Sequence, residues 1–293
     1  MILQTLEKQK LIHPPNWMIE NTMYLTIMGS SAYGVSKDTS DLDIYGFCIP
    51  PKENIFPHLK GEIPGFGRQI QRFEQWSEHH VKNGDKEYDF SVYSIVKYFQ
   101  LVMENNPNMI DSIFTPRRCV IHATQISELV RENRLSFLHK GSFHKFRGYA
   151  MAQFSKIKNK ANSSNPKRAK DIEEFGMDLK FSYHLVRLLL EVEQILVEHT
   201  LDLERNNEVL KAIRRGEWTY EYLEEWFKQK ELHLEHLYAT SNLRNVPDED
   251  KIKDLLLKCL EIHYGSLSNA VKIEVPVEKV LSDLEQIIQR YKS

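Results

Sequence analysis

Cysteine is scarce in this sequence. Only three of its 293 residues are cysteines, Cys48, Cys119 and Cys259, and they stand far apart along the chain. This spacing excludes both the paired pattern of a disulfide-stabilised domain and the close pairs that bind structural zinc. We therefore expect a protein of a reducing compartment, the cytoplasm.

Long apolar runs are also missing. No stretch approaches the ~20 apolar residues that a membrane-spanning helix needs. The first residues soon reach charged Glu7, Lys8 and Lys10, unlike the apolar core of a signal peptide. The sequence predicts a soluble intracellular protein with no membrane partner.

Neither sign of charge dominates the composition. Lys and Arg total 39 and Asp and Glu total 41, which gives a formal net charge of −2. Without an overall positive field, the chain can hold a nucleic acid only through a local basic patch. Residues 140–170 are the most basic window and can contact an RNA or tRNA backbone, although a charged helix surface is an equally ordinary explanation.

The stretch 28–46 (MGSSAYGVSKDTSDLDIYG) contains the pattern most typical of a functional site. The apolar run 24–28 before it predicts a buried strand. That strand ends at Gly29, Ser30 and Ser31, where small residues allow backbone N–H groups to turn toward an anion. The pattern therefore indicates a phosphate-binding turn, with an ordinary turn as the alternative.

A second predicted strand, 42–49, has Asp41 and Asp43 at its start. Side chains at i and i+2 of a strand point to the same face. Two neighbouring carboxylates repel each other unless a cation lies between them, and the usual one is a hard divalent ion. We therefore expect Mg²⁺, or Mn²⁺, bound together with a nucleoside triphosphate (NTP). The alternative for Asp41 is a turn closure or helix cap.

The order of strand, Gly-Ser, Asp-apolar-Asp and strand resembles the signature of the DNA polymerase beta superfamily of nucleotidyltransferases. Such sites take a third carboxylate from a strand beside the one that bears the pair. The alternating segment 87–93 (EYDFSVY) predicts a strand in which Asp89 points away from Tyr88 and Phe90. Asp89 is our candidate, with Glu87 on the same face as the second choice and an exposed strand residue as the alternative.

The other segments of the first half follow from proline, glycine and apolar periodicity. Adjacent histidines point apart on a helix, so we expect no metal pair at His79 and His80. The expected segments are a helix 2–20 interrupted at Pro14-Pro15, an irregular connection 50–67, a solvated amphipathic helix face 68–82, and helices 94–104 and 107–113.

From about residue 135 onward the sequence becomes helical, and this change predicts a domain boundary there. With 293 residues and 41% hydrophobic composition, the chain can bury enough core for two domains, 1–135 and 136–293. The expected helices are 143–160, 167–199, 207–214, 219–237, 248–264 and 277–291.

The longest of these helices carries Lys180, His184 and Arg187 at positions i, i+4 and i+7, so that all three share one face. Three such residues can hold the β- and γ-phosphates of a nucleotide, with Lys as a point charge and Arg as a fork. The alternative is a solvated stripe paired with nearby glutamates.

Nearly the whole chain also resembles a bacterial and phage family of predicted nucleotidyltransferases, some of them associated with RNA ligases. The motifs that carry the resemblance are GSSAYG, SDLDIYG, EIPGFG, EYDFSVYSIVKYF, NNPNMIDSIF, FLHKG, FRGYA, MDLKFSYHLVRLLLEVE and HYGSL. It implies an α+β fold, in which a polymerase-beta-like core with a small mixed sheet precedes an all-helical domain that closes the nucleotide cleft.

The resemblance assigns roles residue by residue. It implies that Gly29, Ser30, Asp41, Asp43 and Asp89 bind the nucleotide and its metal, and that Lys180, His184 and Arg187 contact the triphosphate. All three carboxylates are present, which argues against a catalytically inactive relative.

We therefore expect a metal-dependent enzyme that moves a nucleoside monophosphate from an NTP to a hydroxyl, with an RNA end such as a tRNA as acceptor. The alternatives are nucleotidylation of a protein or small molecule, and a regulatory module that binds nucleotide without turnover. A regulatory module would keep the phosphate-binding turn but can lose the carboxylate at Asp89.

Overall fold

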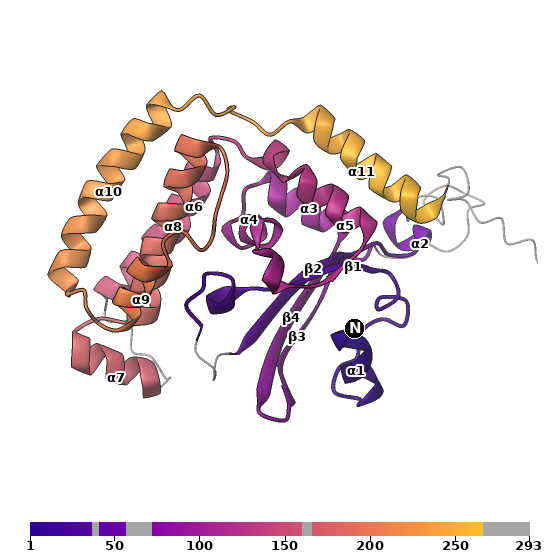
Figure 1. Cartoon of the computed structure of the whole chain (residues 1–293), viewed down its shortest axis with the longest axis horizontal. Coiled ribbons are helices and arrows are strands. Elements are labelled where there is room, and N and C mark those ends of the chain that lie inside the picture. Colours follow the sequence, from indigo (N-terminus) through magenta and orange to yellow (C-terminus); the bar gives the residue numbers. More distant parts are fainter. Residues whose placement is uncertain (37–40, 57–71, 160–165, 266–293) are drawn as a thin grey trace, which may run out of the picture.

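A mixed five-stranded sheet lies at the centre of the molecule (Figure 1). The computed structural model describes residues 1–36, 41–56, 72–159 and 166–265. The strand order is β3-β4-β2-β1-β5. Strands β2 and β4 are parallel, and the other neighbouring pairs are antiparallel. The strands are β1 (Thr22–Ile27), β2 (Leu42–Cys48), β3 (Gln75–Asn83), β4 (Lys86–Ser94) and β5 (Val120–Ala123).

Helices cover the sheet and extend beyond it, so the fold is α+β as expected. Helices α6, α7, α9 and α10 all contact the long helix α8, and in Figure 1 this group lies to one side of the sheet. The α-helices are α1 (Ile2–Lys8), α2 (Lys52–Ile55), α3 (Ile95–Met103), α4 (Pro107–Phe114), α5 (Gln125–Glu132), α6 (Ser142–Lys158), α7 (Pro166–Phe175), α8 (Leu179–Glu198), α9 (Asn207–Arg214), α10 (Tyr220–Thr240) and α11 (Glu249–Tyr264), and short 3₁₀ turns are η1 (Gly29–Ser31), η3 (Arg117–Cys119) and η4 (Arg134–Phe137).

Alternation along the strands divides the apolar residues between the two faces of the sheet. On one face, Tyr24 and Phe47 join a large core with α3, α4, α6 and α8. On the other, Leu25 and Phe90 pack with residues of the α1 region, such as Leu3. Both faces are thus covered. At the end of the sheet where β2 begins, Asp41 is exposed and Asp43 and Asp89 are partly buried. We call this end of the sheet, with these three residues, the acidic edge.

The three strands predicted from sequence are confirmed, with β1 starting two residues earlier than expected. The amphipathic helix expected at 68–82 is wrong where the structure describes it, because 75–83 forms strand β3. A hairpin turn containing Gly84, with φ +62°, pairs β3 antiparallel to β4. Strand β5 and helix α5 were not predicted. Edge strands such as β3 and β5 form by pairing with segments that can be distant in sequence, and the periodicity of one segment contains no information about its partner.

Two predicted helices are shorter than expected. Helix α1 ends at Lys8 rather than continuing toward residue 20. The single helix expected at 167–199 is wrong, since the chain breaks between α7 and α8. Gly176 adopts φ +74° at this break, and the Asp178 carboxylate accepts a 3.0 Å hydrogen bond from the Phe181 N–H to begin α8. The helix expected at 277–291 lies outside the described residues.

The division into 1–135 and 136–293 stays a prediction. One apolar core contains residues from both sides of the proposed boundary, and α11 packs against α3 and α5 of the N-terminal part. The three cysteines are unpaired and buried. Within the described ranges, no helix is long and apolar enough to cross a membrane.

Candidate active site

Two carboxylates meet across the parallel strands β2 and β4. In the register of this pair, Asp43 lies directly opposite Asp89. Both residues are partly buried, whereas Asp41, two residues earlier on the same side, is exposed. The adjacency of Asp43 and Asp89, expected from the resemblance, is therefore present in the sheet itself.

The electrostatic surroundings of Asp43 identify the groups that gather at this edge. Its pKa is raised, chiefly because burial penalises the charged form and next because the carboxylate of Asp89 repels it. Asp41 adds a smaller repulsion, while the positive charges of Lys180 and His79 act in the opposite direction. An excess of negative charge at a partly buried edge favours the binding of a cation there.

The turn after β1 presses against the Asp43 side chain. Gly29 has φ +65°, a conformation that L-residues rarely adopt, and a Cβ placed on it would lie 2.5 Å from Asp43 Oδ2. The Met28 N–H donates a 2.7 Å hydrogen bond to the Asp43 carbonyl. Ser30 and Ser31 continue the turn as η1, and both are partly exposed. The first N–H groups of a helical turn have no partner within it and suit an anion.

A β-bulge brings two histidines to Asp89. The register of β3 against β4 shifts between Glu78 and Val81, and His80 adopts φ +57°. Its backbone N–H donates a 2.7 Å hydrogen bond to Asp89 Oδ1, and His79 Nδ1 lies 3.6 Å from the same oxygen. The helix assumed for these two histidines is wrong, because both lie in strand β3. Their rings contact different carboxylates, His79 that of Asp89 and His80 that of Glu87.

Glu87, the second choice for the third carboxylate, is engaged elsewhere. Its Oε1 lies 2.6 Å from His80 Nδ1, and this contact raises the pKa of His80. Asp89, and not Glu87, is the residue directly opposite Asp43 in the register of β2 and β4.

These carboxylates suit a hard divalent cation, but not as a preassembled cage. In the described part of the chain, no three His, Cys, Asp or Glu side chains converge as a ready metal site. Mg²⁺ commonly uses one or two protein carboxylates and completes its shell with water and substrate phosphates. Asp43 and Asp89, with Asp41 nearby, fit that mode of binding.

Helix α8 directs cationic and neutral donors toward the same edge. Lys180, in its first turn, is exposed, and its charge acts on Asp43. One turn later, the pKa of His184 is well below its usual value because of burial and of the positive charges of Arg187, Lys180, Arg168 and Arg214. His184 is therefore neutral near pH 7 and lies among cations, an environment that suits phosphate oxygens.

Arg187, the third residue of the stripe, is buried in a network of its own. Its guanidinium pairs with Asp111 and with Glu191 Oε2, at 2.8 Å from the latter. It also lies 4.4 Å from the ring of Tyr33, whose hydroxyl donates a 2.7 Å hydrogen bond to Asp111. Arg187 thus joins α8 to α4 and to the turn after β1. The predicted contact of Arg187 with the triphosphate stays a prediction.

Several residues of this region were missed by sequence reasoning. Arg168 and Arg214 come from α7 and α9, and only the general basicity of 140–170 hinted at the first. Asp111 had a clearer signal, since it is a lone carboxylate inside the apolar helix α4 and is fully buried. A buried acid of this kind predicts a buried cationic partner.

Comparison with known proteins agrees with these observations. The model of a family described as the RNA repair pathway DNA polymerase beta family (RlaP) matches residues 2–256. This range includes the acidic edge, the turn after β1 and the whole of α8.

Individual relatives are distant. The chain is 25% identical over 137 residues to an uncharacterized 38.9 kDa protein from the nrdC-mobD intergenic region of Enterobacteria phage T4; the aligned part covers 46% of this chain and 38% of the phage protein. A crystal structure of a nucleotidyltransferase-like protein from Exiguobacterium sibiricum 255-15 is 12% identical with a TM-score of 0.28, covering 81% of this chain and 73% of that one.

Proposed function

Because the chain belongs to the RNA repair pathway DNA polymerase beta family, a group of nucleotidyltransferases, we propose that it transfers a nucleoside monophosphate from an NTP to a hydroxyl group. The observation that supports this most directly is the register of β2 and β4, which sets Asp43 opposite Asp89 beside the tight turn at Gly29. In the reaction, the acceptor oxygen bonds to the α-phosphorus, and the bond from that phosphorus to its bridging oxygen breaks to release pyrophosphate.

The proposed metal residues are Asp41, Asp43 and Asp89, with Mg²⁺ or Mn²⁺ as the ion. Such an ion, when bound, stabilises the negative charge that develops on the phosphate oxygens. Asp89 accepts the proton of the attacking hydroxyl on the carboxylate oxygen that the His80 N–H does not occupy. That hydrogen bond also holds the Asp89 carboxylate in one orientation for the transfer.

The triphosphate is held from two sides in this proposal. The backbone N–H groups of Gly29, Ser30 and Ser31 bind its terminal oxygens. Lys180 contributes an exposed positive charge and His184 a neutral N–H donor from α8. The Arg187 guanidinium already has two carboxylate partners and holds Tyr33 and the turn in place, and its direct contact with the triphosphate remains the prediction made from the sequence.

An RNA end, such as that of a tRNA, is the acceptor that we propose. The description of the family supports an RNA substrate, and the basic window 140–170 falls on α6 and α7, beside the cationic residues around His184. A protein or small-molecule acceptor would use the same acidic edge but would not need these basic helices.

Transfer of label tests the proposal. The purified chain is incubated with each α-³²P-labelled NTP, Mg²⁺ and either total RNA or total protein, with an Asp89→Asn variant in parallel. We expect label in the RNA fraction with the wild-type chain and none with the variant. Label in the protein fraction alone would mean that the acceptor is a protein and not RNA. Tight NTP binding without label in either fraction would mean that the chain binds nucleotide without transferring it.

A further inference from the structure

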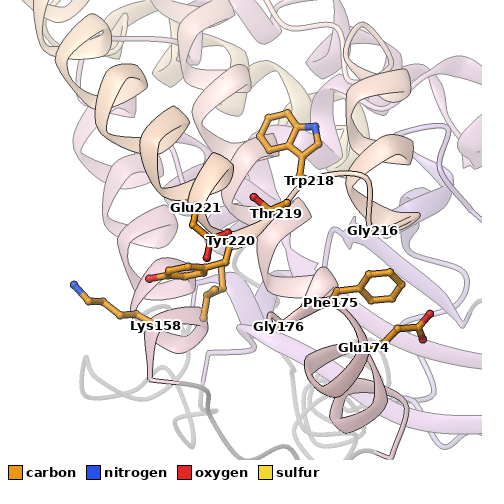
Figure 2. A pocket seen from close by; sticks show the side chains of 10 residues that line it. Lys158, Glu174, Phe175, Gly176, Gly216, Trp218, Thr219, Tyr220 and Glu221 are labelled. Atoms are coloured by element: carbon orange, nitrogen blue, oxygen red, sulfur yellow. The ribbon is translucent and has the colours of Figure 1, made fainter.

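A cavity of about 630 Å³ opens on the helical part of the molecule, away from the acidic edge. It lies where three segments meet: the C-terminal end of α6, the break between α7 and α8, and the turn between α9 and α10 (Figure 2). Its lining residues are Ile157, Lys158, Glu174, Phe175, Gly176, Gly216, Trp218, Thr219, Tyr220 and Glu221.

The aromatic walls of the cavity are held in place by packing. The Phe175 ring lies against Gly216, where an added Cβ would be 2.2 Å from Phe175 Cε1. Gly216 also has φ +77°, so this turn requires glycine both for space and for conformation. Trp218 is braced by edge-on contacts with Tyr222 at 4.7 Å and with Trp226 at 5.6 Å.

Aromatic and charged residues both contribute to the lining of the cavity. In Figure 2, the rings of Tyr220 and Phe175 lie on opposite sides of the cavity, and the Lys158 side chain extends beyond Tyr220. Glu174 and Glu221 add carboxylates to the lining. A flat ring entering between the aromatic walls would meet acceptors for its amino groups and a cation for an attached phosphate.

Cations continue from this cavity toward the acidic edge. Lys156 lies 5.2 Å and Arg168 4.8 Å from the ring of Phe181, which stands next to Lys180 in the first turn of α8. Arg168 and Lys180 both act on His184, and Lys180 acts on Asp43. Positive charges therefore connect the cavity with the proposed transfer site.

We propose that this cavity binds an unpaired nucleobase of a single-stranded RNA whose phosphates follow these cations and whose end reaches the acidic edge. Stacking on aromatic side chains combined with a cationic path for the backbone is how proteins hold single-stranded nucleic acids. This inference rests on the proposed function and adds to it the strandedness of the acceptor and the place where it binds.

The test compares two tyrosines of α10. Tyr220 lines the cavity, whereas Tyr238, near the other end of the same helix, does not and instead stacks on Phe143 at 4.8 Å. Binding of a fluorescein-labelled, ten-nucleotide single-stranded RNA is measured by anisotropy at one salt concentration for wild type, Tyr220→Ala, Phe175→Ala and Tyr238→Ala. A blunt RNA duplex and unlabelled ATP are titrated in parallel.

We expect Tyr220→Ala and Phe175→Ala to raise the dissociation constant for the single strand by about 5- to 150-fold, the equivalent of ~1–3 kcal/mol per stacked base. Tyr238→Ala should change it less than about twofold, and wild type should bind the duplex more weakly than the single strand. Affinity for ATP should stay the same in all variants. Melting curves confirm that each variant is folded.

Three outcomes would overturn this inference. Single-strand affinity unchanged in both cavity variants excludes the cavity as an RNA site. Equal losses in the Tyr238→Ala variant would assign the effect to α10 as a whole and not to the cavity. Weaker ATP binding in Tyr220→Ala with unchanged RNA binding would place the base of the substrate nucleotide in the cavity. Label transfer measured on the same variants tests the proposed function separately. Transfer to protein without RNA binding would refute the RNA site in the cavity but would leave the proposed nucleotidyl transfer intact.

Discussion

Replacing Asp43 by Asn separates the catalytic role of this carboxylate from its effect on the fold. In the wild-type chain, Asp43 faces Asp89 across neighbouring strands, which lie ~4.8 Å apart in sheets. Two unit charges at that distance repel by roughly 1 kcal/mol even in a water-like dielectric. The variant removes this repulsion and keeps the shape of the side chain, so we expect it to be more stable by about 1 kcal/mol at pH 7.

The pH dependence of stability has a definite sign. The pKa of Asp43 is raised in the folded chain, chiefly by burial and then by Asp89. The folded state therefore holds this proton more tightly than the unfolded state, and stability falls as the pH rises from the ordinary aspartate pKa through the raised one. The variant should lack this fall, so its advantage over wild type should vanish at the acidic end of the range.

Activity should change in the opposite direction from stability. Loss of a proposed metal ligand should reduce nucleotidyl transfer by more than about 100-fold, since metal stabilisation of the transition state amounts to several kcal/mol. Urea unfolding at several pH values gives the stability, and label transfer with saturating Mg²⁺ gives the activity. Asp85→Asn, in the exposed turn of the β3–β4 hairpin, is the matched control and should change neither.

Two results would refute this reasoning. Normal turnover by Asp43→Asn would remove Asp43 from the metal site. A variant less stable than wild type at pH 7 would mean that the carboxylate makes a stabilising contact that outweighs its repulsion from Asp89.

Three further substitutions test other parts of the site. Arg187→Ala leaves two buried carboxylates without their cation, so the free energy of unfolding measured in urea should fall by ~3–5 kcal/mol. A fall below ~1 kcal/mol together with weaker NTP binding would instead support direct contact of Arg187 with a phosphate. Lys180→Ala should weaken NTP binding by ~1.5–3 kcal/mol in calorimetric titration, the range for hydrogen bonds to charged groups. An unchanged affinity would mean that Lys180 does not contact the nucleotide. Gly29→Ala should abolish NTP binding, because its Cβ would lie 2.5 Å from Asp43 Oδ2. Gly84→Ala is the control for backbone strain alone, since Gly84 has φ +62° and no atom lies within 4 Å of the added Cβ. Equal effects of the two substitutions on NTP binding would contradict the steric argument.

Local patterns in the sequence were sufficient for the centre of the sheet. The runs that form β1, β2 and β4 were correctly identified because burial on a strand follows the period of two. The grouping of Asp41 with Asp43 as metal residues stays a prediction, and Asp41 lies just before the start of β2. The position of Asp89 beside them came from the family resemblance, since no local rule decides which strand lies next to β2.

Contacts between distant segments decided the rest. The bulge that brings His79 and His80 to Asp89 exists only because β3 pairs with β4, and the segment was read from sequence as helical. Helical spacing placed Arg187 on one face with Lys180, but it did not reveal that Asp111, 76 residues earlier, would occupy its guanidinium.

The cavity at the end of α6, the break between α7 and α8 and the turn between α9 and α10 also depends on contacts between distant segments. The sequence alone indicated a long helix through Phe175 and Gly176, because amphipathic periodicity continues across them. In the folded chain, Gly176 turns the backbone and Phe175 packs on Gly216, 41 residues later in the sequence. Periodicity reports which face of a segment is apolar, and it therefore predicted β1, β2, β4 and most helices of this protein. Only the folded chain determines which faces pack together. The carboxylate pair, the Arg187 network and the aromatic cavity all depend on such packing.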